Sequence, residues 1–261
     1  MRLTTFLICL YLSSFDLVAQ GNGTLHLITS IDIVNSDIAQ GCSKDYQNTN
    51  ELFKAVAEMG GLNYHPVNLQ FDREQVEAFV NNFQCAPNDV VVFLYSGHGF
   101  QYDNDGDLWP WPHLFYCNRE KVDIYTDACE LDLEDVYDLL KEKNPRMSIT
   151  LGNSCNDPLD SSEESTQTAG QKPDFSKSGG DLQKIGLFTN FRGHIIASAS
   201  SPGQGAYTTD EEGAYFIVEL FKYIAEGLDS DQPTSWKNIL EQTKNSVTER
   251  NANQTPQYKI E

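Results

Sequence analysis

DVVVFLY at residues 89–95, followed by SGHG at residues 96–99, is the stretch of this 261-residue chain that says most about its fold. A short run of apolar and mainly β-branched residues is typical of a strand in a parallel sheet that is covered on both faces. The glycines on either side of His98 indicate a tight turn after that strand. The stretch therefore predicts a buried strand with a histidine just past its carboxyl end.

A second strand with a polar turn is expected further along the chain. Residues 147–151 read MSITL and residues 152–156 read GNSCN, so Cys155 follows this strand as His98 follows the first. Parallel neighbours end at the same edge of a sheet, and open α/β sheets bind their ligands at that edge. We therefore expect His98 and Cys155 to lie side by side, which is the minimum equipment of a hydrolase with a cysteine nucleophile.

Each of these two residues also has a plainer interpretation. His98 could be a core histidine whose hydrogen bonds are satisfied, and Cys155 could be one half of a disulfide. The two glycines and the position of both residues at strand ends favour the catalytic interpretation.

The rest of the chain alternates between strand and helix patterns. Apolar residues at helical spacing predict helices between β-branched or alternating runs. This order indicates βαβ units, and hence an α/β fold with a mostly parallel central sheet flanked by helices on both faces. The expected strands are residues 24–33, 62–69, 89–95, 147–151 and 194–199, and the expected helices are residues 48–59, 73–83, 131–143, 214–225 and 235–248.

The amino-terminal residues 1–20 have the features of a secretory signal peptide. Arg2 is followed by a mainly apolar stretch, and small residues near Ala19 offer a cleavage site. The apolar stretch is too short to span a bilayer, and no later stretch is long enough. We expect an exported protein, secreted or periplasmic, in which residues 21–261 form a single domain.

One polar segment interrupts the pattern. Residues 156–187 are rich in Ser, Glu, Gln, Asp, Lys and Gly and have few apolar positions. Loops of this length inside a domain are usually functional or disordered. Lys172, Lys177 and Lys184 are candidates for proteolytic cleavage there.

The cysteine count is informative in an exported chain. Removal of the signal takes Cys9 away and leaves five cysteines. At least one thiol then has no intramolecular partner, and Cys155 is the expected free thiol. The others lie in polar or loop-like contexts and could form two disulfides in any of three pairings: Cys42, Cys85, Cys117 and Cys129.

The net charge excludes one class of partner. The formal net charge of the chain is −20 at pH 7. Such a surface repels phosphate backbones and anionic lipids, so we expect no nucleic-acid partner. The other histidines have no metal-ligand spacing, which argues against a zinc hydrolase.

These strand ends and their order resemble the caspase and metacaspase family of cysteine endopeptidases, over nearly the whole mature chain. In that family, strings like SGHG and NSC carry the catalytic dyad. Three other strings resemble the family's substrate loop and helix start, its carboxyl-terminal element and the acidic loop of metacaspases. They are ASASSPGQGA at residues 197–206 with GAYF at 213–216, QTPQ at 254–257, and DNDGD at 103–107.

The resemblance implies a Cys–His dyad. Cys155 would attack a scissile carbonyl as thiolate, and His98 would accept its proton and later protonate the leaving amine. The backbone N–H groups of Gly99 and Cys155 would form the oxyanion hole. Family members do not depend on a third carboxylate. The polar segment falls where they carry the linker between large and small subunits, so self-processing there is a further expectation.

Specificity is where this chain departs from the family. Metacaspases usually carry Asp two residues before the catalytic cysteine, and caspases carry Gln. This chain has Asn153 there, and with Ser200 and Ser201 of the substrate loop it completes the expected substrate-binding set. No Arg stands at either place, which argues against cleavage after Asp. Metacaspases also usually carry a second acidic residue in the small-subunit half, where the substrate loop of this chain is neutral. The absence of both acids weakens the argument for cleavage after Arg or Lys.

The chemistry itself needs no cofactor. Asp103, Asp105 and Asp107 alternate and could supply oxygens to Ca²⁺, as in calcium-dependent metacaspases. Gly106 and Leu114 do not fit the EF-hand pattern. A solvated acidic turn is the plainer interpretation of this loop.

Two hypotheses of function follow. The first is an exported cysteine endopeptidase with His98 and Cys155 as its dyad. The second is a catalytically silent caspase-like module that binds a peptide or protein. The missing acids favour the second, and the intact dyad with its glycines favours the first. A peptide or protein is the expected partner under both hypotheses.

Overall fold

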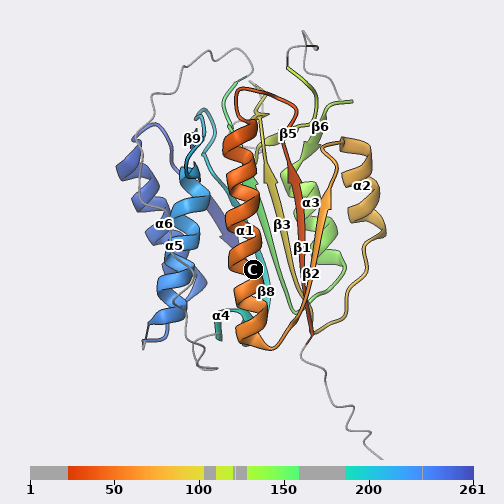
Figure 1. The fold of residues 1–261 in the computed structure, drawn as a ribbon, viewed down its shortest axis with the longest axis vertical. Helices are drawn as coiled ribbons and strands as arrows, with labels where there is room; N and C mark the ends of the chain where they lie inside the picture. The colour runs from red at the N-terminus through yellow and green to blue at the C-terminus, as the bar shows by residue number, and fades with distance from the viewer. Residues whose placement is uncertain (1–22, 103–109, 120, 122–127, 159–185, 231) are drawn as a thin grey trace, which may run out of the picture.

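Six strands form the central sheet of this computed structural model, which describes residues 23–102, 110–119, 121, 128–158, 186–230 and 232–261. The strand order is β11-β8-β7-β3-β1-β2, and every neighbouring pair is parallel except β11 with β8. The predicted α/β fold with a mostly parallel sheet is therefore confirmed (Figure 1). The strands are β1 (Thr24–Ile31), β2 (Asn63–Leu69), β3 (Val90–Ser96), β7 (Met147–Asn153), β8 (Gly193–Ser198) and β11 (Gln257–Ile260).

Helices cover both faces of the sheet, as predicted. Helices α1, α4, α5 and α6 pack on one face, and α2 and α3 pack on the other (Figure 1). Every residue of β3 and β7 is consequently buried, which explains the largely apolar composition of β3. The helices are α1 (Ala39–Gly60), α2 (Arg73–Asn82), α3 (Leu133–Glu142), α4 (Gly186–Thr189), α5 (Tyr215–Asp229) and α6 (Trp236–Arg250).

The register of β3 against β7 decides where the site lies. The two strands are parallel neighbours, and Ser96 is paired with Asn153. The Gly97 N–H continues the pairing with a hydrogen bond of 3.1 Å to the Asn153 carbonyl oxygen. His98 and Cys155 therefore each follow two residues after a paired position. The prediction that these strands are parallel neighbours with a common end is confirmed.

Helix α1 begins at Ala39, nine residues before its predicted start. The first turns bury Asp45, Asn48 and Thr49 together with Cys42, so the inward face of the helix is polar at this end. Apolar periodicity cannot reveal a helix whose buried face is polar. The predicted end is confirmed, because Gly61 caps the helix with a φ of 61° in the left-handed region.

Several short strands beside the central sheet were not predicted. Each has two or three residues, which is too short to show a strand periodicity. Strand β4 follows His98 directly, and β9 follows the substrate loop. The five short strands are β4 (Gly99–Phe100), β5 (His113–Phe115), β6 (Glu130–Asp132), β9 (Thr208–Thr209) and β10 (Gly213–Ala214).

Among the described cysteines, one disulfide is formed of the two that the sequence allows. Cys117 is bonded to Cys129, and Cys42, Cys85 and Cys155 are free. Cys155 is thus a free thiol, as predicted, whereas a second bridge between Cys42 and Cys85 is not formed. Cys42 belongs to the core on the α1 face and Cys85 packs against the core on the α2 face. The sheet separates the two thiols, so they cannot approach to bonding distance.

Three predicted features lie outside the described residues. These are the signal peptide at residues 1–20, most of the polar segment (residues 159–185) and the acidic loop with Asp103, Asp105 and Asp107. Among the residues that are described, no helix has both the length and the apolar composition needed to cross a membrane.

Candidate active site

His98 lies in the turn between β3 and β4, where the backbone is closely packed. A Cβ atom on Gly99 would lie 2.6 Å from the Ser154 side chain and 2.7 Å from the Cys155 carbonyl oxygen. Only glycine permits this approach, which brings the histidine turn against the cysteine turn. The Tyr95 hydroxyl donates a hydrogen bond of 2.6 Å to the His98 carbonyl oxygen and so fixes the backbone of the turn.

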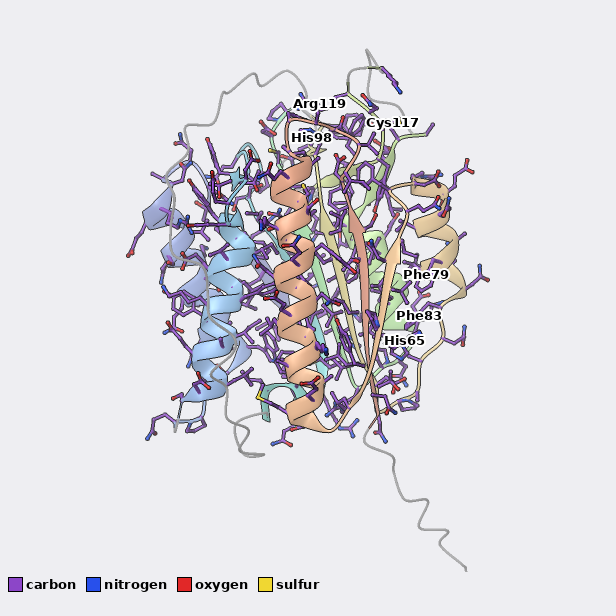
Figure 2. The ribbon with its side chains drawn as sticks, viewed as in Figure 1. His65, Phe79, Phe83, His98, Cys117 and Arg119 are labelled. Carbon is purple, nitrogen blue, oxygen red and sulfur yellow. A yellow bond between two sulfur atoms is a disulfide. The ribbon has the colours of Figure 1, made fainter. Side chains whose placement is uncertain are left out.

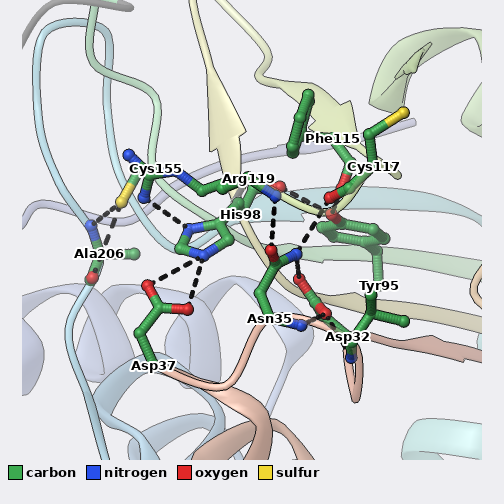
Figure 3. Close-up of polar contacts among 11 residues, drawn as sticks. Asp32, Asn35, Asp37, Tyr95, His98, Phe115, Cys117, Arg119, Cys155 and Ala206 are labelled. Atoms are coloured by element: carbon green, nitrogen blue, oxygen red, sulfur yellow. Dashed lines mark hydrogen bonds and ion pairs between the residues drawn. The ribbon is translucent and has the colours of Figure 1, made fainter. Parts of the chain in front are cut away.

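The imidazole of His98 lies between a carboxylate and a guanidinium (Figure 3). Its Nε2 is 3.3 Å from Oδ1 and 3.2 Å from Oδ2 of Asp37. Its Nδ1 is 3.3 Å from Nη1 of Arg119. Burial lowers the pKa of His98 below 6.5, and Asp37 opposes that shift. A histidine with a lowered pKa is neutral at pH 7 and can accept a proton.

A hydrogen-bonded chain from β1 holds Arg119 in place. The Asp32 carboxylate accepts hydrogen bonds from the backbone N–H groups of Val34 and Asn35 and from the Asn35 side chain. Asn35 in turn donates to the Cys117 carbonyl oxygen at 3.0 Å and accepts from the Arg119 N–H at 2.7 Å. The segment after β1 therefore positions the segment that carries Arg119 (Figure 3).

The Cys155 thiol faces the substrate loop. Its Sγ accepts a hydrogen bond of 3.2 Å from the Ala206 N–H. Burial raises its pKa to about 11 and Asp157 adds to the rise, whereas Ala206 and Arg119 act in the opposite direction. The group is therefore a neutral thiol at pH 7, and a nucleophilic role requires a base.

His98 and Cys155 are brought to the same edge without a direct hydrogen bond between them in the described part of the chain. Figure 3 shows the Arg119 guanidinium lying between the sulfur and the imidazole. Figure 2 shows His98 and Arg119 together at the end of the sheet where β3 finishes. Catalytic hydrogen bonds are often absent before substrate binds, so this geometry is compatible with a dyad.

The predicted substrate residues lie around Cys155, with their side chains engaged internally. Asn153 is 5 % exposed and donates to Asp45 at 2.9 Å. Ser200 is fully buried and donates to the Ser154 carbonyl oxygen at 3.0 Å. Ser201 donates to the Thr255 carbonyl oxygen at 2.8 Å. A substrate contact by Asn153, Ser200 or Ser201 stays a prediction.

The carboxyl-terminal string at residues 254–257 supports the substrate loop. Gln254 donates to the Ala199 carbonyl oxygen at 3.1 Å and accepts from the Tyr207 N–H at 3.2 Å. The Thr255 N–H donates to the Gln204 side chain at 2.7 Å. These contacts fix the loop that presents the Ala206 N–H to the thiol.

A fully buried carboxylate, Asp45, lies beneath the site. It accepts hydrogen bonds from the Ser96 hydroxyl at 2.6 Å, the Asn153 amide at 2.9 Å and the Ala214 N–H at 2.8 Å. One side chain of α1 thus joins the ends of β3 and β7 to the start of α5. Burial raises the pKa of Asp45 to about 7, against the effect of these three donors.

Three residues of this site were not predicted from the sequence. Asp37 follows β1, which is the other neighbour of β3, so the rule that ligand sites lie at the carboxyl edge could have drawn attention to it. Asp45 lies on the unpredicted first turns of α1. Nothing in the local sequence marks Arg119, because its position depends on a loop closed by a disulfide. No cluster of three or more metal-ligating side chains occurs in the described ranges.

The parallel sheet, the two layers of helices and the paired turns define the class of caspase-like α/β domains. A family model described as the caspase domain (peptidase family C14) matches residues 33–261. The chain therefore belongs to the caspase domain family, whose fold is that of a cysteine peptidase.

A solved structure shows the same fold at low identity. The chain is similar to caspase-1 from Spodoptera frugiperda, with 12 % sequence identity and a TM-score of 0.53, over 91 % of this chain and 86 % of that chain. None of the curated proteins matches the chain.

Proposed function

We propose that this protein is an exported cysteine endopeptidase that hydrolyses peptide bonds with Cys155 as nucleophile and His98 as general base. The observation that carries the proposal is the register of β3 and β7. In this register His98 and Cys155 each lie two residues beyond the paired residues Ser96 and Asn153, and Gly99 packs against the Cys155 carbonyl group. The neutral state of both side chains at pH 7 suits a thiol that is deprotonated only when a base accepts its proton.

The mechanism follows from this pairing. The Cys155 thiol gives its proton to His98 Nδ1 as the sulfur attacks the scissile carbonyl carbon. The backbone N–H groups of Gly99 and Cys155 bind the oxyanion, and loss of one such donor typically costs about 10²–10³ in rate. Protonated His98 then gives the proton to the leaving amine. Water hydrolyses the resulting thioester with His98 again as base.

Other parts of the proposal rest on the sequence. Export rests on the signal-like residues 1–20, and self-processing rests on the polar segment at residues 156–187. Binding of Ca²⁺ at Asp103, Asp105 and Asp107 is a further prediction, and the chemistry itself does not use it. Asn153, Ser200 and Ser201 are proposed to shape the substrate cleft.

A silent, peptide-binding module is the second candidate. Arg119 occupies the space between the Cys155 sulfur and the His98 imidazole (Figure 3). The Asn153 side chain is engaged with Asp45. A protein in which this arrangement is permanent would bind a peptide without cleaving it.

A panel of fluorogenic peptides tests the proposal. The peptides carry Arg, Lys, Asn, Gln or Asp at P1, and each is assayed with and without Ca²⁺. We expect turnover of at least one peptide by the wild-type protein and none above background with Cys155→Ala. Equal rates for the two proteins, or no turnover of any peptide by the wild type, would contradict an enzymatic function.

A further inference from the structure

The two nitrogens of the His98 ring have partners of opposite chemistry. Nε2 faces both carboxylate oxygens of Asp37, at 3.2 and 3.3 Å. Nδ1 faces the guanidinium of Arg119 at 3.3 Å. Asp37 comes from the segment between β1 and α1, whereas Arg119 comes from the segment after β5. The contacts are therefore long-range and are made by different parts of the fold (Figure 3).

These partners determine the tautomer of neutral His98. A guanidinium has only hydrogen-bond donors, so Nδ1 must present its lone pair to Arg119. An ionised carboxylate only accepts, so Nε2 must carry the proton. Nδ1 is also the nitrogen on the side of Cys155 (Figure 3). The ring is thus already in the tautomer that can accept the thiol proton.

We propose that Asp37 is a positioning residue that holds His98 in this tautomer and orientation, which makes the site a Cys–His–Asp arrangement. The inference rests on the proposed function of the same site, and it adds a carboxylate that the sequence analysis did not expect. The Cys155 proton goes to Nδ1 and leaves from Nδ1 to the amine. The Asp37 carboxylate stabilises the imidazolium that forms between these steps.

In the resting state, Arg119 contacts the ring nitrogen of His98 that would accept the thiol proton. Its side chain is exposed, and its guanidinium faces the Nδ1 lone pair that must accept the thiol proton. The thiol proton can reach Nδ1 only while this guanidinium has moved aside, which an exposed side chain can do without substrate. Asp37 is on the opposite side of the ring, so it keeps the orientation of His98 while Arg119 moves.

Replacement of Asp37 is expected to affect kcat more than KM. The Asp37 side chain is 58 % exposed, so water competes for Nε2 and the loss is smaller than for a buried triad carboxylate. We expect Asp37→Ala to lower kcat roughly tenfold to a hundredfold with KM within about twofold. Asp37→Glu, which keeps a carboxylate, should recover part of the loss. Glu58→Gln, which removes an exposed charge from the far end of α1, is the matched control and should leave kcat unchanged.

The pH dependence of kcat/KM distinguishes a positioning role of Asp37 from a general loss of structure. The charged or titratable groups that face His98 are Asp37, Asp32, Arg119 and the Cys155 thiol. Asp37 raises the pKa of His98, so its removal lowers that pKa further. The acidic limb of kcat/KM should consequently move to lower pH in Asp37→Ala and stay in place in Glu58→Gln.

A spectroscopic measurement tests the inference without turnover. Nitrogen-15 NMR of the full chain, with His98 assigned by comparison with His98→Gln, should show Nε2 protonated in the neutral wild-type ring. The His98 pKa should be lower in Asp37→Ala. The opposite tautomer, or an unchanged pKa, would overturn the role of Asp37. If no peptide is cleaved, the proposed function fails. The NMR titration still shows, without turnover, whether Asp37 sets the tautomer and pKa of His98.

Discussion

Hydrolysis of a peptide substrate is expected to fall by about 10²–10⁴ in kcat when His98 is replaced by alanine, because the thiol then has no base in reach. The Cys155 pKa of about 11 leaves almost no thiolate at pH 7. The attack of the sulfur therefore depends on proton transfer to His98. Initial rates with the best peptide of the fluorogenic panel give the size of the loss.

His65→Ala is the matched control for this prediction. His65 is an exposed histidine on the edge strand β2 and lies toward the end of the sheet opposite to that of His98 (Figure 2). Its removal should leave the rate within about twofold of the wild type, as expected for an exposed substitution far from the site. A rate for His98→Ala that equals the rate of this control would rule out His98 as the base.

Asp45 is expected to make folding stability depend on pH. Its pKa is raised from 3.8 to about 7 in the folded protein by burial, whereas in the unfolded chain it stays near its ordinary value. Between these pH values the folded state binds a proton that the unfolded state has lost, so this contribution to the free energy of unfolding falls as pH rises from about 4 to about 7. A shift of this size corresponds to roughly 4 kcal/mol at most.

Asp45→Asn removes the titration with little change in shape. The amide introduced at position 45 has an available acceptor, because Oδ1 of Asn153 has no hydrogen-bond partner. Urea unfolding of both proteins between pH 5 and pH 8 measures the effect. The stability of Asp45→Asn relative to the wild type should rise by about 2 to 3 kcal/mol over this range. A constant difference would show that Asp45 is ionised at both pH values.

The strands that precede His98 and Cys155 could be predicted because their signal is local. Residues 90–95 form a continuous run of apolar and aromatic residues, and residues 147–151 combine Met, Ile and Leu with Ser and Thr, which is compatible with strands buried on both faces. The βαβ order made these strands candidates for parallel neighbours, and the structure pairs Ser96 with Asn153. The histidine and cysteine turns were therefore placed at the same edge from sequence alone.

The remainder of the site depends on contacts between distant segments. Asp37 is 61 positions from His98 in the sequence, and Asp45 is 108 positions from Asn153. No periodicity or spacing links such pairs. The second disulfide that the sequence allowed is not formed for a related reason, because only the fold reveals that a sheet lies between Cys42 and Cys85.

The most direct test of the account compares two thiols in one protein. Cys85 and Cys155 are both half-buried and free, and each has a pKa raised to about 11. Intrinsic acidity alone would make them equally slow toward iodoacetamide at pH 7, whereas a base beside Cys155 would make that thiol faster.

Alkylation of each cysteine can be followed by peptide mass spectrometry in the wild type and in His98→Ala. The account predicts that Cys155 reacts at least tenfold faster than Cys85 in the wild type, within the range that a positioned base supplies. This advantage should be lost in His98→Ala, with the Cys85 rate unchanged. Equal rates for the two thiols in the wild type, or a Cys155 rate that does not depend on His98, would contradict the assignment of Cys155 and His98 as a catalytic pair.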